Sequence, residues 1–244
     1  MTHDDSVPEL DEIVQAHNDI GSRLKASGVP YAWSWDTIIH PEGSSAARAA
    51  AILRTWSRQP APIRGILLHG GAGLGKTGIA VSIIRDAVMR QDGARWVWNL
   101  TTAPKVLAAV EAGDFRRRPA PATFYRWRDL KSLLDRAKIG QTPWDDEMPP
   151  LTAEKVLREL EERCSVLALD DIDVDTLTPW KEEILLRLLD LPLQGTRVVI
   201  TTNADPTSPD GVARLGERVV DRLMDPSLFA RFALTGNSLR RRMK

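Results

Sequence analysis

Residues 70–77 constrain the fold of this chain more than any other segment. They are Gly70, Gly71, Ala72, Gly73, Leu74, Gly75, Lys76 and Thr77, and they satisfy the pattern G-x-x-x-x-G-K-[ST]. The segment follows a short apolar run, residues 65–69, and precedes a helical pattern that extends to about residue 89. Four glycines allow consecutive backbone N–H groups to face phosphates at the positive end of the following helix. The sequence therefore predicts a strand–loop–helix unit in which these eight residues bind ATP.

Two consecutive aspartates provide a second motif. Apolar residues 166–169 predict a buried strand, and Asp170 and Asp171 follow at its carboxyl end, where open α/β sheets bind ligands. We expect Lys76 to neutralise the β- and γ-phosphates, and Thr77 and Asp170 to hold Mg²⁺. Asp171 would orient or deprotonate the attacking water, although its short side chain is also compatible with slow hydrolysis. An acidic loop after a strand is the alternative interpretation.

A third polar group follows another predicted strand. Residues 196–201 form an apolar run that ends in Thr201-Thr202-Asn203. Asn203 would lie one strand away from the magnesium aspartate, where its side chain could bind the attacking water or the γ-phosphate. An asparagine after a strand is equally an ordinary turn residue, and its position alone leaves both interpretations open.

The alternation of strand and helix patterns predicts one α/β domain. Strands are expected at residues 65–69, 95–99, 165–169, 196–201 and 229–234, and helices at 45–57, 76–89 and 179–189, the last capped by Thr178. Such alternation implies a parallel five-stranded sheet flanked by helices. The expected ATPase domain covers residues 26–244, with an insertion at about 113–150. Residues 1–25 are expected to form an acidic helical extension that could bind a partner.

Composition restricts the class of protein. The 244 residues carry 33 basic and 33 acidic side chains, so any nucleic-acid surface must be a local patch. A single cysteine excludes an internal disulfide and any multi-cysteine zinc site. The acidic first residues lead us to expect no signal peptide, and the sequence contains no apolar run of the ~20 residues that span a bilayer. We expect a cytoplasmic protein, of a bacterial or phage-infected bacterial cell, without membrane contact.

Further segments resemble one branch of the AAA+ ATPases. They are SGVP (27–30), VVITTN (198–203), GERVVDRL (216–223) and GNSLR (236–240), in addition to the two nucleotide motifs. Together they resemble the DnaC/IstB-like AAA+ family, most of all the DnaC-type replicative helicase loaders. The resemblance implies a P-loop AAA+ fold and Mg²⁺-dependent ATP hydrolysis. It also implies that Arg240 is the sensor 2 arginine and that Arg222, with Arg218 as the alternative, is an arginine finger. Such a finger acts on a neighbouring subunit and so implies an ATP-dependent homo-oligomer.

The same resemblance implies partners. A protein of this type binds single-stranded DNA and loads a DnaB-type replicative helicase, and we expect the same here. An IstB-like transposition helper that remodels target DNA and recruits a transposase uses the same motifs and stays an alternative. A nucleotide-gated binding module that barely hydrolyses ATP is a third possibility.

Cationic and aromatic residues alternate within the expected insertion. The cations are Arg116, Arg117, Arg118, Arg126 and Arg128, and the second cluster reads FYRWR over residues 124–128. Single strands are bound by arginines that contact phosphates and by rings that stack on bases, so these arginines are the candidate DNA contacts. The alternative is a helix that turns Phe124 and Trp127 toward the core while its arginines face solvent.

Overall fold

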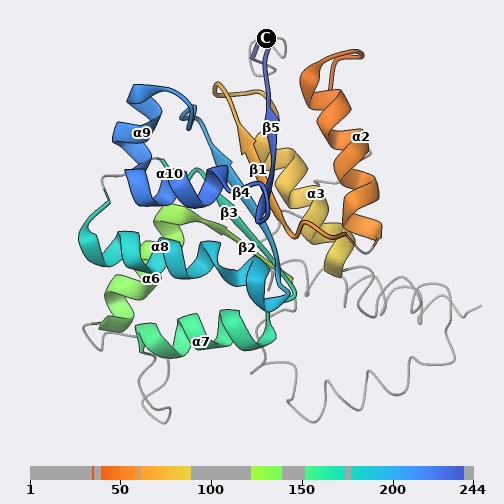
Figure 1. Cartoon of the computed structure of the whole chain (residues 1–244). Helices are drawn as coiled ribbons and strands as arrows, with labels where there is room; N and C mark the ends of the chain where they lie inside the picture. Colours follow the sequence, from red (N-terminus) through yellow and green to blue (C-terminus); the bar gives the residue numbers. More distant parts are fainter. Residues whose placement is uncertain are drawn as a thin grey trace, which may run out of the picture.

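The computed structural model describes Trp35 and residues 40–59, 61–88, 122–138, 152–173 and 177–238. Its elements, in chain order, are α2 (Ser45–Arg58), β1 (Gly65–His69), α3 (Lys76–Val88), β2 (Ala122–Arg126), α6 (Trp127–Lys138), α7 (Ala153–Arg163), β3 (Val166–Asp170), α8 (Pro179–Leu189), the 3-10 helix η4 (Leu191–Gln194), β4 (Arg197–Thr202), α9 (Pro209–Leu215), α10 (Glu217–Met224) and β5 (Phe229–Ala233). Strands alternate with helices, as the sequence predicts (Figure 1).

The five strands form one parallel sheet in the order β2-β3-β4-β1-β5. The strand that precedes the glycine-rich loop, β1, lies between β4 and β5, and β4 separates it from β3. Because all strands run the same way, the residues that follow β1, β3 and β4 meet at one edge of the sheet. The loop after β1, the aspartates after β3 and Asn203 after β4 are thereby brought together.

Two hydrophobic cores cover the two faces of the sheet. Successive residues of a strand point to opposite faces, so each strand contributes to both cores. One core contains Leu67, Leu167, Leu169, Val198 and Ile200 with apolar residues of α6, α7, α8 and α10. The other contains Ile66, Leu68, Val166, Ala168 and Val199 with residues of α2 and α3. Figure 1 shows α2 and α3 on one side of the sheet and the remaining helices on the other.

Side-chain caps fix where four helices begin. The hydroxyls of Ser44, Thr152, Thr178 and Ser208 accept from the backbone N–H groups of residues 47, 155, 181 and 211 at 3.0–3.4 Å. Each such bond satisfies a donor that the first turn of a helix leaves without a partner. The predicted cap at Thr178, followed by proline at the first helical position, is confirmed.

The second strand of the sheet differs from the expected one. Residues 122–126 form β2 and pair in parallel with β3, whereas residues 95–99 lie outside the described part of the chain. The interpretation of residues 113–150 as an insertion is therefore wrong for residues 122–138, which form β2 and α6. Phe124 and Trp127 are 7% and 0% exposed, so these rings are core residues and are not available to stack on bases.

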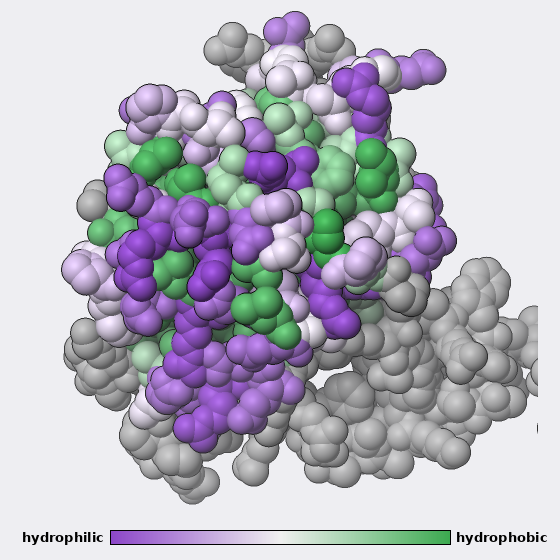
Figure 2. All heavy atoms as spheres, in the orientation of Figure 1, coloured by the Kyte–Doolittle hydropathy of each residue, from purple (hydrophilic) through white to green (hydrophobic). Residues whose placement is uncertain are grey.

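The helices opposite α2 and α3 carry a polar outer surface. Figure 2 shows hydrophilic side chains gathered over α7 and α8. Arg187 of α8 forms ion pairs there with Glu154, at 2.8 Å, and Glu161 of α7. Within the described residues, no helix has both the length and the apolar character required to cross a bilayer.

Candidate functional site

Glycine is required at two positions of the loop. Gly70 and Gly73 have φ values of +130° and +79°, in the region that favours glycine. A Cβ atom on Gly70 would lie 2.1 Å from the carbonyl oxygen of Leu234, and one on Gly73 would lie 2.1 Å from the hydroxyl of Ser238. The segment after β5 therefore lies directly against the loop, close to the sequence that leads to Arg240.

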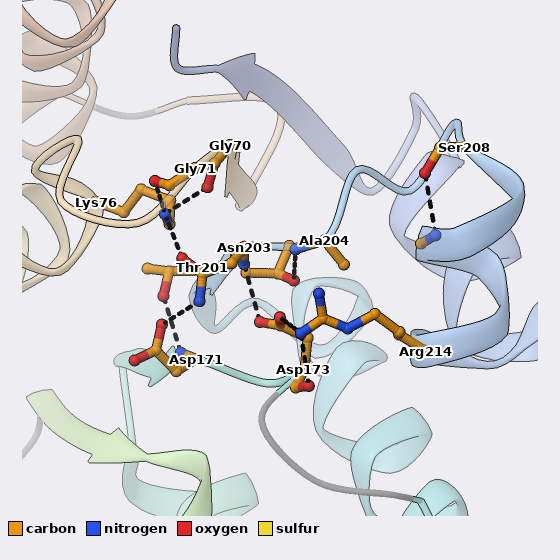
Figure 3. A network of polar contacts seen from close by, with 12 residues as sticks. Gly70, Gly71, Lys76, Asp171, Asp173, Thr201, Asn203, Ala204, Ser208 and Arg214 are labelled. Atoms are coloured by element: carbon orange, nitrogen blue, oxygen red, sulfur yellow. Dashed lines mark hydrogen bonds and ion pairs between the residues drawn. The ribbon is translucent and has the colours of Figure 1, made fainter. Parts of the chain in front are cut away.

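Lys76 is buried at the first position of α3 and its ammonium points back into the loop. Nζ donates to the carbonyl oxygens of Gly70 at 2.6 Å and Gly71 at 2.8 Å, and to Oδ1 of Asn203 at 2.9 Å (Figure 3). Phosphate oxygens are acceptors of the same kind and carry negative charge. A nucleotide in this loop could therefore replace the carbonyl oxygens as partners of the ammonium.

Asp170 is the buried carboxylate at the end of β3, with 2% of its surface exposed. Thr201 donates to its Oδ1 at 2.6 Å, and Thr77 donates to Oδ1 at 2.9 Å and to Oδ2 at 3.1 Å. Burial raises the pKa of Asp170, and the negative charge of Asp171 raises it further. The two threonine hydroxyls and the charge of Arg126 lower this pKa but offset the increase only in part.

Asp171 has a backbone conformation that is rare outside glycine. Its φ is +56°, the only positive value among the described non-glycine residues. Its N–H donates to Oγ1 of Thr201 at 2.9 Å, and its Oδ1 accepts from Nδ2 of Asn203 at 3.3 Å. The turn directs this carboxylate toward Asn203, and such strain persists where surrounding bonds hold it.

Asn203 links Lys76 to Asp171, two of the residues that the sequence predicted at this site. Its side chain accepts from Lys76 and donates to Asp171, while its backbone N–H donates to Oδ1 of Asp173 at 2.9 Å. Figure 3 shows Asn203 between the loop and the two aspartates. The structure thus places Asn203 at the common edge of the sheet, together with Lys76 and Asp171.

The residues present fit a magnesium ion. Hydroxyl and carboxylate oxygens are preferred ligands of Mg²⁺, and Thr77 and Asp170 bring one of each into direct contact. A divalent cation would also offset the cost of burying the Asp170 charge. The described residues contain no group of three or more His, Cys, Asp or Glu that could hold a metal. Two protein ligands are enough for Mg²⁺ when phosphates and water supply the rest.

Sequence reasoning missed two residues of this site. Thr201 binds both Asp170 and the N–H of Asp171, and the available signal was a hydroxyl residue that follows the apolar run 198–200 of β4. Asp173 was read only as part of an acidic loop, although its carboxylate is fully buried and contacts Asn203. A pattern of consecutive carboxylates does not show which of them points inward.

The predicted arginines lie apart from the loop or outside the described residues. Arg222 forms an ion pair with Asp190 at 2.9 Å, and Arg218 lies 3.9 Å from Glu182 and 3.8 Å from Glu183, so both contact α8 or the residue that follows it. Arg126 is exposed and lies beside Asp170 in the sheet register, whereas Arg128 contacts Asp129 at 3.5 Å. Arg116, Arg117, Arg118 and Arg240 lie outside the described part of the chain.

The fold is similar to that of replication proteins of known structure. No protein-family profile and no curated protein matches the sequence. A crystal structure of the DnaC helicase loader superposes with a TM-score of 0.57 at 20% identity, covering 84% of this chain and 98% of the loader. This chain has the fold of the DnaC helicase loader. The predicted α/β fold, a parallel five-stranded sheet flanked by helices, is thereby confirmed.

Two further structures share this fold. DnaI superposes with a TM-score of 0.50 at 15% identity, covering 88% of this chain and 92% of DnaI. AMPPCP-bound DnaA from Aquifex aeolicus superposes with a TM-score of 0.55 at 15% identity, covering 87% of this chain and 53% of DnaA. At these identities the likeness is one of fold.

The buried charge of Asp170 has a consequence for stability. Its raised pKa means that the folded state binds this proton more readily than the unfolded chain, whose carboxyl titrates near ~3.9. Protonated Asp170 contributes its full stability below about pH 3.9. This contribution is lost as the pH rises through the raised pKa that Asp170 has in the folded state. We therefore expect Asp170→Asn to increase the free energy of unfolding at pH 7 without nucleotide, and this gain to shrink toward pH 4. Urea titrations at several pH values measure it.

Asp205 provides a control, because its pKa is shifted in the opposite direction to that of Asp170. Hydrogen bonds from Thr207 lower the pKa of this exposed carboxyl, so its contribution is present above ~3.9 and is lost in acid. Asp205→Asn should lower the free energy of unfolding at pH 7. An Asp170→Asn protein that is less stable than wild type at pH 7 would contradict the assignment of Asp170 as a destabilising buried charge.

Proposed function

We propose that this chain is a magnesium-dependent ATPase. The observation that supports this most strongly is a pair of contacts among three parts of the chain: Lys76 with Asn203, and Thr77 with Asp170. These contacts cross the ends of β3 and β4 and the start of α3. A glycine-rich turn without a nucleotide function would require none of them.

Each residue has a role that follows from its contacts. Lys76, already directed into the loop, would bind phosphate oxygens, and the backbone N–H groups of the loop would bind the others. Bound Mg²⁺, held by Thr77 and Asp170, would neutralise charge on the phosphates. Asn203 and Asp171 would orient water between them, because the amide is bonded to both the lysine and the carboxylate. The roles of Arg222 as arginine finger and of Arg240 as sensor 2 arginine are proposed from the family resemblance.

The assembly proposal rests on Arg222. Its ion pair with Asp190 directs it toward α8, and its side chain is 41% exposed. A guanidinium in this position is accessible to a second copy of the chain. We propose that Arg222 acts on the ATP of a neighbouring subunit, so that hydrolysis depends on a homo-oligomer.

We further propose a role in DNA replication. Support comes from the shared fold with the DnaC helicase loader and with DnaI, and from the sequence segments that resemble this branch. The proposed partners are a DnaB-type helicase, bound through residues 1–25, and single-stranded DNA, bound through Arg116, Arg117 and Arg118. Arg126 lies closer to the nucleotide site, and its charge acts on Asp170. Recruitment of a transposase in an IstB-like reaction is the alternative.

Nucleotide binding and hydrolysis respond differently to two substitutions. Lys76→Ala removes a charged donor to phosphate, and ATP affinity should fall about 10- to 100-fold, since such bonds contribute ~1.5–3 kcal/mol. Asp170→Asn should retain ATP binding within about threefold and lower Mg²⁺-dependent kcat about 100-fold. Fluorescent nucleotide titration and phosphate release measure the two effects. Wild-type turnover in both variants would refute the site.

The proposed action of Arg222 on a neighbouring subunit can be tested by mixing two variant proteins. Arg222→Ala should bind ATP normally and hydrolyse it about 1000-fold more slowly, as for the loss of other arginine fingers. Adding Lys76→Ala protein, which keeps Arg222, should restore part of the rate, because one variant supplies the pocket and the other the arginine. Full turnover by a wild-type monomer at high dilution would refute the proposal.

The partner proposals are separated by two binding measurements. Deletion of residues 1–25 should abolish co-purification with a DnaB-type helicase and leave ATP binding unchanged. Replacing Arg116, Arg117 and Arg118 with alanine should weaken single-strand binding and reduce its salt dependence by ~0.7 in slope per lost phosphate contact. If the full-length protein captures a transposase and no helicase, the loader proposal is wrong and the transposition-helper alternative is favoured.

A further inference from the structure

Asp173 is a buried carboxylate that contacts neither the loop nor Asp170. Its side chain is 0% exposed, and its two oxygens face different elements. Oδ1 accepts the backbone N–H of Asn203 at 2.9 Å, at the end of β4. Oδ2 accepts from the guanidinium of Arg214 at 2.6 Å, in the last turn of α9. Asp173 therefore bridges the residue that contacts Lys76 and a helix outside the nucleotide site (Figure 3).

The helix on the far side of this bridge is connected to the candidate arginine finger. α9 ends at Leu215, Gly216 alone separates it from α10, and α10 carries both Arg218 and Arg222. α10 packs against α9 and against α8. Val219 and Leu223 anchor α10 in the core. A displacement of this helix pair therefore reaches Arg214, and through Asp173 it reaches the backbone of Asn203.

We propose that Asp173 is a positioning residue that couples Asn203 to the α9–α10 pair. The inference rests on the proposed ATPase function, and it adds a route by which contact with a neighbouring subunit changes hydrolysis. When α10 is held by a neighbour, Arg214 fixes Asp173, and Asp173 fixes Asn203 against Lys76 and Asp171. The group touches no substrate atom and acts through Asn203.

A purely structural role for Asp173 would require fewer partners than the structure shows. A buried charge needs a partner, and Arg214 alone would satisfy that need. The second oxygen, however, binds the backbone of the one residue that joins Lys76 to Asp171. Asparagine at position 173 can satisfy only one of the two partners, because its amide offers one acceptor and one donor where both partners donate. The two roles can therefore be separated.

The experiment compares Asp173→Asn and Arg214→Gln with wild-type protein. In both variants kcat for ATP hydrolysis should fall about tenfold or more, with KM changed less than about threefold, because Asn203 is misplaced and phosphate binding is retained. Hydrogen exchange should be faster at the Asn203 amide in Asp173→Asn. AMPPCP should change the exchange of residues 209–224 in wild type, and this response should be lost in both variants. Arg214→Lys, which keeps the cation, should recover part of each effect.

Arg187→Gln is the matched control. Arg187 also pairs with a poorly exposed carboxylate, Glu161, whose side chain is 16% exposed, but this ion pair joins α7 to α8. The control should keep wild-type kcat and a wild-type exchange response. Wild-type kcat and exchange in Arg214→Gln, or an equal loss in Arg187→Gln, would overturn the coupling and leave the ATPase proposal intact. A wild-type protein that binds no ATP would instead overturn the proposed function, and the coupling with it. Arg214 is 46% exposed, so Arg214→Gln keeps the test valid if Asp173→Asn does not fold.

Discussion

The arrangement of the candidate nucleotide site depends on the buried carboxylate of Asp170. This charge is located at the end of a strand whose residues are all buried, where an ionised group without partners would be strongly unfavourable. Thr201 from β4 and Thr77 from α3 supply the two hydroxyl donors that make it tolerable. Satisfying one charge therefore fixes β3, β4 and the first turn of α3 relative to one another. The same geometry places a hydroxyl and a carboxylate oxygen side by side, which is the arrangement that the proposed magnesium ion would use.

The chain that follows β5 packs against the glycine-rich loop, although the two segments are far apart in the sequence. The carbonyl of Leu234 and the hydroxyl of Ser238 occupy the space that side chains at positions 70 and 73 would need. Leu234 also donates its N–H to the carbonyl of His69 at 2.8 Å, which continues the β1–β5 pairing past the end of the strand. The two glycines thus have two functions. They allow the backbone to turn, and they permit a close approach that couples the chain after β5 to the glycine-rich loop.

The sequence predicted those parts of the molecule whose signals are local. The strand at 65–69, the helix from residue 76 and the capped helix at 179–189 have clear boundaries, and each is observed at those positions. Residues 124–128 were ambiguous because interleaved rings and arginines suit both a DNA surface and a helix with its rings toward the core. The pairing of β2 with β3 places Phe124 in the sheet, and Trp127 at the start of α6 is fully buried. Asp173 could not be identified either, since its partners Asn203 and Arg214 follow 30 and 41 positions later.

The ion pair between Arg222 and Asp190 is compatible with a role in a neighbouring subunit. Both side chains are partly exposed, although the Asp190 oxygen that faces Arg222 is itself buried. Releasing Arg222 would leave this oxygen without its cation, and a bidentate bond between the guanidinium and a phosphate would have to offset that cost. The pair between Arg214 and Asp173 is costlier to break, since the whole Asp173 side chain is buried and would lose its cation. The helix pair thus combines an arginine whose partner is partly exposed with one whose partner is fully buried, as a finger and its anchor would require.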